Sequence, residues 1–185
     1  MAKLIPAYII VVLDQFSKLK VKSLYESGKL FNESGELFNG PILGGLLKFR
    51  FYENPGLAFG ISVGNLGWLL FIITVLITFY ILYYLLRTDD FGVCESFALS
   101  LILGGAVGNL IDRGCALFNL FGYNGVIDFI DIGIFTHSFR WPYIFNIADL
   151  SVSIGIIIFI THSFLNSNSD ELKNEIIDEL NNEKV

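Results

Sequence analysis

The chain has 185 residues, of which 54% are hydrophobic and only 16% are charged. Average soluble domains carry about 25% charged residues, so a chain this apolar cannot cover its hydrophobic surface in one soluble core of its size. The net charge of −6 arises mostly in the acidic C-terminal residues, and the few, scattered basic residues argue against nucleic-acid binding.

Four stretches are apolar enough to cross a bilayer, which requires about 20 mostly apolar residues. These predicted spans are residues 4–24, 66–86, 95–112 and 143–165. The second span has no charge, and Trp68 lies near one of its ends as an interfacial anchor should. The first span is not a signal peptide, because Asp14 ends its apolar run and no small-residue cleavage site follows. We therefore expect an all-α membrane protein with four transmembrane helices and both termini on one side.

The connections between these spans differ in length. Residues 25–65 and 113–142 form two long loops on one face, whereas residues 87–94 form a short turn on the face with the termini. The segment LLKFRFY, residues 46–52, alternates apolar and basic residues and predicts a small β element on the membrane surface. In that strand, Leu47, Phe49 and Phe51 would face lipid, and Lys48 and Arg50 would face head groups. Residues 168–185 predict an acidic amphipathic tail that is separate from a peptidase domain formed by residues 1–167.

Ionisable residues within membrane spans are costly and usually functional. Asp14, Asp112, Asp128 and Asp149 all fall toward the face with the long loops. Asp112 and Asp149 each follow an asparagine, Asn109 and Asn146, by three residues, which places each pair on one helix face.

Neighbouring carboxylates cannot both ionise cheaply, so one pKa rises and the pair divides into an acid and a base. Such a pair can hydrolyse an amide without a metal or a covalent nucleophile. His137 and His162 have no candidate partner, and Cys94 and Cys115 lack metal-ligand or redox spacing. No cofactor or metal is expected.

Five blocks in order resemble the signal peptidase II family, the lipoprotein signal peptidases. These blocks are DQFSK (14–18), NPGLAFG (54–60), GGAVGNLIDR (104–113), VIDFID (126–131) and FNIADLSVSIG (145–155). The resemblance implies an aspartic endopeptidase that removes the signal peptide of diacylglyceryl-modified prolipoproteins by cutting before the lipidated cysteine. Its expected partners are these substrates and membrane lipid, and it is expected to act as a monomer.

The resemblance also implies roles for individual residues. Asp128 and Asp149 match the catalytic pair. The matching supporting or substrate-binding residues are Asp14, Lys18, Asn54, Gly56, Ala58, Phe59, Asn109, Asp112, Arg113 and Asn146. Residues 114–127 are longer than expected for the family, which leaves Asp131 as an alternative to Asp128, although the match of VIDF favours Asp128.

Two arguments favour opposite orientations of the chain in the membrane. A count of Lys and Arg near the membrane would place the long loops in the cytoplasm. The family resemblance instead implies the bacterial cytoplasmic (inner) membrane, with cytoplasmic termini and an active site toward the outer face. We follow the resemblance, because Lys18, Lys48 and Arg50 would then meet lipid phosphates.

Other readings of the same residues remain open. A proton-coupled transporter would use a chain of carboxylates through the membrane depth, and a non-enzymatic assembly factor would use the glycines of the third span for packing alone. Asp112 and Arg113 also fit a simple interfacial ion pair.

Overall fold

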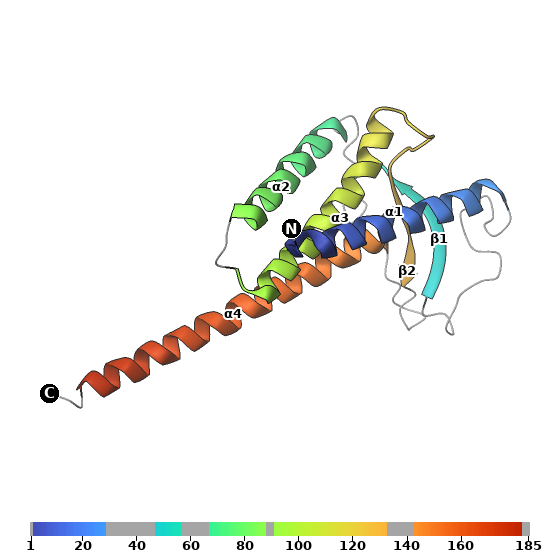
Figure 1. Ribbon diagram of the computed structural model, residues 1–185. Helices are drawn as coiled ribbons and strands as arrows, with labels where there is room; N and C mark the ends of the chain where they lie inside the picture. Colours follow the sequence, from blue (N-terminus) through green and yellow to red (C-terminus); the bar gives the residue numbers. More distant parts are fainter. Residues whose placement is uncertain (1, 29–46, 57–66, 88–90, 133–142, 183–185) are drawn as a thin grey trace.

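The computed structural model describes residues 2–28, 47–56, 67–87, 91–132 and 143–182, with side chains through residue 166. A short 3-10 turn, η1 (Ala2–Leu4), precedes four helices: α1 (Ile5–Glu26), α2 (Gly67–Arg87), α3 (Val93–Leu117) and α4 (Ile147–Asn182). Three antiparallel strands, β1 (Leu47–Asn54), β2 (Val126–Ile132) and β3 (Ile144–Phe145), form one sheet in the order β1-β2-β3. Figure 1 shows this sheet at the end of the bundle where α1 and α3 finish and where α2 and α4 begin.

Three of the helices are long and apolar enough to cross a membrane: Gly67–Arg87, Val93–Leu117 and the first part of α4, Ile147–Asn166. α1 is equally long but carries several charges. Its Asp14 and Lys18 are fully buried against the other helices, whereas Tyr8 and Phe16 are exposed. The buried charges of α1 thus face the bundle, whereas most of its exposed side chains are apolar, so α1 fits the fourth membrane helix that the sequence predicts.

α3 is the central helix and contacts α1, α2 and α4. A Cβ atom on Gly105 would collide with the carbonyl oxygen of Ala148 and would lie 2.5 Å from Oγ of Ser151. A Cβ atom on Gly108 would lie 2.5 Å from Oδ2 of Asp14. These glycines therefore allow α1 and α4 to approach α3 closely at the sheet end of the bundle.

The predicted β element is confirmed, but its partner strand was not predicted. β1 pairs with β2, from Leu47 opposite Ile132 to Asn54 opposite Val126. Residues 126–132 were expected to be a loop.

The expectation that Phe49 and Phe51 face lipid is wrong. Phe49 stacks on Phe129, and Phe51 stacks on Tyr25 of α1. This face of β1 packs on a cluster that includes the buried Ile127, so the sheet is joined to the bundle by an apolar core of its own.

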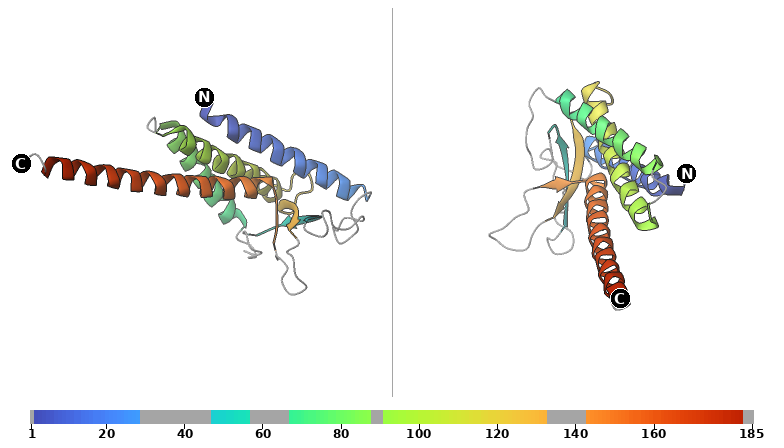
Figure 2. Two further views of the ribbon diagram at one scale, coloured as in Figure 1. Left: turned by 90° about the horizontal axis from the view of Figure 1, so that it is seen from below. Right: turned by 90° about the vertical axis from the view of Figure 1, so that its left-hand side faces the viewer.

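The fourth helix also differs from its predicted range. It begins at Ile147 rather than at residue 143, because residues 144–145 form β3. It then continues without a break to Asn182, so the expected tail is the extension of the same helix. Figure 2 shows α4 extending well beyond the other helices, on the side away from the sheet.

Candidate active site

A buried lysine joins two carboxylates at the sheet end of the bundle. The Nζ atom of Lys18 lies 2.8 Å from Oδ2 of Asp14 and 3.0 Å from Oδ2 of Asp112, and it donates a hydrogen bond to Oδ1 of Asn109 at 2.9 Å. Lys18, Asp14 and Asp112 are all fully buried. An ammonium group has three N–H donors, and each of them has an acceptor here. The charge of Lys18 is therefore neutralised inside the protein, so the expectation that Lys18 meets lipid phosphates is wrong.

The two carboxylates also bind backbone N–H groups of the elements that carry the catalytic candidates. Oδ1 of Asp14 accepts a hydrogen bond from the N–H of Ala148 in the first turn of α4, at 2.9 Å. Oδ2 of Asp112 accepts one from the N–H of Ile127 in β2, at 3.0 Å. Asp14 therefore fixes the start of α4, and Asp112 fixes β2.

Asn146 and Asp149 form a reciprocal cap at the start of α4. The N–H of Asp149 donates to Oδ1 of Asn146 at 2.9 Å, and the N–H of Asn146 donates to Oδ2 of Asp149 at 3.2 Å. This is the capping-box arrangement of an N-cap residue and the third helical residue. The sequence predicted a pair on one face inside the helix. The pair instead forms the beginning of the helix, and Asp149 lies in its first turn.

Asp128 lies on β2 and is almost completely buried. Its Oδ1 accepts a hydrogen bond from Nδ2 of Asn146 at 2.7 Å, and its Oδ2 accepts one from Nδ2 of Asn54 at 3.2 Å. Burial, and next the charge of Asp149, raise the pKa of Asp128 from 3.8 to about 7. At neutral pH this carboxyl group is therefore protonated in a large fraction of molecules.

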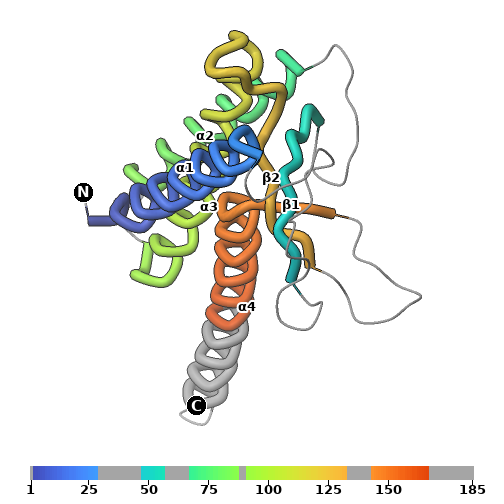
Figure 3. The backbone as a smooth tube through the Cα atoms, turned by 90° about the vertical axis from the view of Figure 1, so that its right-hand side faces the viewer, coloured from blue at the N-terminus to red at the C-terminus, as the bar shows by residue number. Residues whose placement is uncertain are grey.

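Asn109 links the buried ion pairs to both catalytic candidates. Its Oδ1 accepts hydrogen bonds from Lys18 and from Asn146, and its Nδ2 donates to Oδ1 of Asp149 at 2.7 Å. Asn146 in turn contacts Asp128. One hydrogen-bonded network thus joins α1, α3, β2 and α4. Figure 3 shows α4 beginning beside β2, at the end where α1 and α3 approach the sheet.

A cavity of about 160 Å³ lies beside this network. It is lined by Asn54 and Gly56 at the end of β1, by Arg113 of α3, by Gly67 and Leu70 of α2, and by Asn124 and Gly125. Asn54 belongs to both features, because it lines the cavity and donates to Asp128, while its Oδ1 accepts the N–H of Gly56 at 3.0 Å. A ligand in this cavity would therefore lie next to Asn54, the hydrogen-bond partner of Asp128.

The structure places the predicted residues as follows. One hydrogen-bonded network contains Asp14, Lys18, Asn54, Asn109, Asp112, Asp128, Asn146 and Asp149. The adjacent cavity is lined by Gly56 and Arg113. The expected ion pair of Asp112 is formed with Lys18 rather than with Arg113. Ala58 and Phe59 lie outside the described residues.

Gln15 is a member of the network that the sequence analysis missed. Its Nε2 lies 3.0 Å from Oδ1 of Asp112 and 3.1 Å from the carbonyl oxygen of Gly108. It is a neutral residue next to Asp14, and the packing of α1 on α3 identifies its role. In the sequence, its position beside Asp14 in the block DQFSK was the available signal.

Asp131, the alternative to Asp128, lies elsewhere. It is three residues from Asp128 on the same strand, so the two side chains leave opposite faces of β2. Asp131 forms an ion pair with Arg50 of β1, with 3.6 Å between Oδ2 and Nη1. His162 lies at the other end of the bundle, where its Nδ1 is 3.5 Å from Oε1 of Glu95.

The chain is similar to known proteins along most of its length. A family model described as signal peptidase (SPase) II matches residues 6–165. A lipoprotein signal peptidase of Halalkalibacterium halodurans is 36% identical over 152 residues, which cover 82% of this chain and 85% of that protein. A lipoprotein signal peptidase of Staphylococcus aureus is 31% identical over 170 residues, covering 92% of this chain and 91% of that protein. A solved bacterial membrane enzyme superposes with a TM-score of 0.68 at 30% identity, covering 91% of this chain and 90% of the other.

Proposed function

The chain belongs to the signal peptidase II family, and on that basis we propose that Asp128 and Asp149 are the catalytic pair of a membrane-embedded aspartic endopeptidase. As a member of this family, the protein is a hydrolase that removes signal peptides from prolipoproteins. The observation that carries the residue assignment is the double role of Asn146. It forms the capping box with Asp149, and its amide donates to Asp128.

The two carboxyl groups differ in a way that suits acid and base roles. Asp128 is buried, and its pKa is raised to about 7, which favours the protonated form. Asp149 is partly exposed and accepts hydrogen bonds from Asn109 and from the N–H of Asn146, so its carboxyl group can be reached by a water molecule. We therefore assign Asp128 as the acid and Asp149 as the base.

This assignment gives a balanced hydrolysis. Asp149 takes a proton from a water molecule, whose oxygen attacks the scissile carbonyl carbon, while Asp128 donates its proton to the carbonyl oxygen. The tetrahedral intermediate then collapses. Its hydroxyl proton returns to Asp128, the C–N bond breaks, and the leaving amine takes the proton from Asp149. Both residues are restored, and no other reactant is consumed.

The finer substrate assignment follows the family resemblance. The substrate is a prolipoprotein whose cysteine already carries a diacylglyceryl group, and the cut falls directly before that cysteine. The cavity supports this proposal, because residues of the apolar helix α2 line it together with Arg113 and with Asn54, which donates to Asp128. The enzyme acts as a monomer in this proposal.

The proposed orientation puts the sheet at the outer face of the bacterial cytoplasmic membrane and both termini in the cytoplasm. The buried charges support it. Lys18 is neutralised by Asp14 and Asp112, and Lys22 contacts Glu26, Glu53 and the carbonyl oxygen of Gly122. Neither lysine is a free positive charge of the loop face. The count that favoured cytoplasmic loops is correspondingly weakened.

The transporter alternative is not supported. The four carboxylates of the network are gathered at the sheet end. Among the helix residues whose side chains the structure describes, the acidic residue at the opposite end is Glu95, near the start of α3. A relay through the membrane depth would require carboxylates between these two levels.

Substitution of the two aspartates tests the catalytic assignment. Asp128→Asn and Asp149→Asn should each abolish cleavage of a diacylglyceryl-modified prolipoprotein in detergent, because an amide cannot exchange the required proton. Asp131→Asn is the matched control on the opposite face of the same strand, and it should retain most of the activity. Near-normal turnover in either active-site variant would refute the assignment, and a dead Asp131→Asn beside an active Asp128→Asn would exchange the two residues of β2.

A further inference from the structure

The turn that follows α3 exposes three large apolar side chains. Phe118, Leu120 and Phe121 are 63%, 46% and 80% exposed, respectively. We call these three side chains the apolar tip. Nothing in the catalytic network uses them, and they belong to the segment that is longer than expected for the family.

The backbone of this turn is well defined by its own hydrogen bonds. The N–H groups of Asn119 and Leu120 donate to the carbonyl oxygens of Ala116 and Cys115 at 3.2 and 2.8 Å, which is the Schellman pattern of a helix end. A second turn follows directly, in which the N–H of Tyr123 donates to the carbonyl oxygen of Leu120 at 3.2 Å.

Phe121 has an unfavourable conformation within that second turn. Its φ is +53°, and the φ of Gly122 is +66°. Two consecutive positive φ values are typical of a type I′ turn, in which Asn, Asp or Gly is preferred. A bulky residue is strained in this region, so the surrounding structure must hold it in place.

The inner side of the turn supplies that support. Nζ of Lys22 donates to the carbonyl oxygen of Gly122 at 3.0 Å, and Nδ2 of Asn124 donates to Oε2 of Glu53 at 2.7 Å. Tyr123 is buried in the cluster under the sheet. The polar and buried groups of the turn thus face the protein, while the apolar tip faces away from it.

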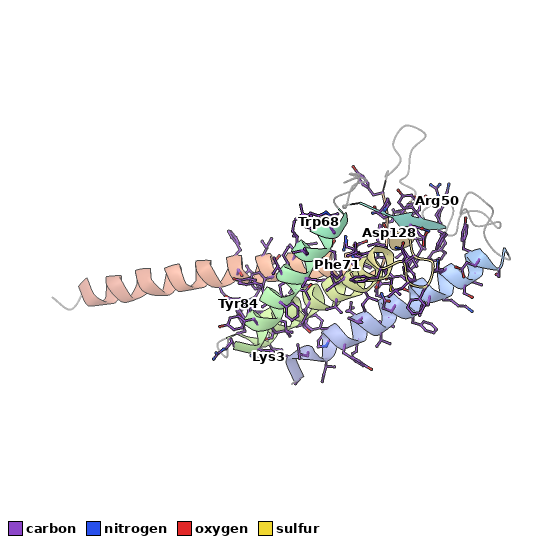
Figure 4. The ribbon with its side chains drawn as sticks, turned by 90° about the horizontal axis from the view of Figure 1, so that it is seen from above. Lys3, Arg50, Trp68, Phe71, Tyr84 and Asp128 are labelled. Carbon is purple, nitrogen blue, oxygen red and sulfur yellow. The ribbon has the colours of Figure 1, made fainter. Side chains whose placement is uncertain are left out.

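The surroundings of the tip indicate what covers it. The ring of Phe118 contacts the ring of Phe71 edge-to-face, with 6.2 Å between centroids. Phe71 belongs to the membrane-spanning α2, and Trp68, one turn earlier on that helix, is 51% exposed. Figure 4 shows Trp68 and Phe71 nearer to Asp128 and Arg50, whereas Tyr84 and Lys3 lie farther from them, on the side toward which α4 extends. The tip therefore continues the lipid-facing surface of α2 at its boundary, where aromatic residues concentrate.

We propose that Phe118, Leu120 and Phe121 form an interfacial anchor that inserts into the boundary between acyl chains and head groups of the bilayer at the active-site end. The occupant of this surface is bilayer lipid. Asn124 and Gly125, in the same turn, line the cavity next to Asp128's partner Asn54. Insertion of the tip consequently fixes the depth of that cavity in the membrane. The proposal does not depend on which aspartates are catalytic.

Fluorescence quenching by brominated lipids tests this insertion without any cleavage assay. In a background with Trp68→Phe and Trp141→Phe, Phe121→Trp provides a single reporter at the tip, and Leu76→Trp provides a matched reporter in the middle of α2. In vesicles without substrate, Phe121→Trp should show blue-shifted emission and stronger quenching by bromines near the ester end of the chain than by deep ones. Leu76→Trp should show the reverse depth preference.

Two results would overturn the proposal. One is water-like emission of Phe121→Trp without quenching, while Leu76→Trp is quenched. The other is quenching that appears only after a lipidated prolipoprotein is added, which would assign the tip to the substrate instead of the bilayer. If Phe121→Trp does not fold, Phe118→Trp reports on the same tip from a position with φ of −92°, where an aromatic residue is not strained, and the same outcomes decide.

Discussion

Lys18 supplies the positive charge that pairs with two buried carboxylates, Asp14 and Asp112. Lys18→Met would leave two buried carboxylates facing each other without a counter-charge. Removing one partner of a buried ion pair costs about 3–5 kcal/mol, so this variant should melt well below the wild type and lose activity. Thermal unfolding in detergent measures this effect. Lys20→Met, at an exposed position two residues away on the same helix, should melt like the wild type. Equal melting of all three proteins would show that the pairing contributes nothing.

The raised pKa of Asp128 should make activity and stability depend on pH. Burial and the charge of Asp149 raise its pKa from 3.8 to about 7, so the folded state binds this proton more tightly than the unfolded chain does. The resulting stability is fully present below about pH 4 and is lost as the pH rises through about 7, in parallel with the loss of the proposed catalytic acid. Cleavage should therefore decline above neutral pH.

The matching measurement is a series of melting temperatures from about pH 5 to about pH 8. The wild type should lose stability across this range, and Asp128→Asn should lose less, because it has no carboxyl group to ionise. An identical pH dependence in the two proteins would contradict the raised pKa of Asp128.

At the level of single residues, the sequence predicted which side chains gather but not how they pair. Asp112 was paired with its neighbour Arg113, whereas its actual partner, Lys18, is far away in the sequence. Lys18 was assigned to lipid phosphates because the orientation implied by the family resemblance places it at the outer membrane surface. Pairing across helices depends on which faces meet, and one sequence does not contain that information.

The close contact between α3 and α4 requires glycine at position 105. Gly105→Ala would place a methyl group against the carbonyl oxygen of Ala148 and Oγ of Ser151, and backbone cannot move aside cheaply. α4 would have to shift at the turn that carries Asp149. We expect lower thermal stability and a large loss of kcat. Gly114→Ala is the matched control on the same helix, because its methyl group would make only an ordinary contact with Phe71. This control should be as stable as the wild type or more stable by about 0.5–1 kcal/mol. Normal activity of Gly105→Ala would show that α4 can approach the site without this close contact.

β2 and the continuation of α4 were missed in the sequence for different reasons. β2 was not recognised because nearly all of its residues are buried, so VIDFIDI lacks the alternation that identifies a half-exposed strand. α1, α2 and α3 were predicted because their apolar lengths match a bilayer. The tail was separated from α4 because Asn168 and Glu171 match a capping pair, which predicts the start of a new helix, although polar residues can also continue a helix that has left the membrane.

The orientation of the whole molecule can be tested by labelling. In a background with Cys94→Ala and Cys115→Ala, Glu36→Cys and Asn181→Cys provide one thiol each in the first long loop and near the C-terminus. On intact spheroplasts, a membrane-impermeant thiol reagent should label position 36 and leave position 181 unlabelled until the membrane is permeabilised. The reverse pattern would overturn the proposed topology and, with it, an active site at the outer face.

The internal pair of α1 has a consequence for biosynthesis. α1 precedes α3 in the chain, so Asp112 and Asn109 of α3 are not yet made when α1 leaves the ribosome. A lone lysine in hydrocarbon is costly, but Lys18 already has Asp14 at 2.8 Å, one turn away on the same helix. α1 can therefore enter the bilayer as a locally neutral segment and wait there. The site becomes complete only when α4, which carries Asp149, is translated and its first turn meets Asp14. The proposed catalytic pair is therefore absent from the nascent chain until the start of α4 has been translated.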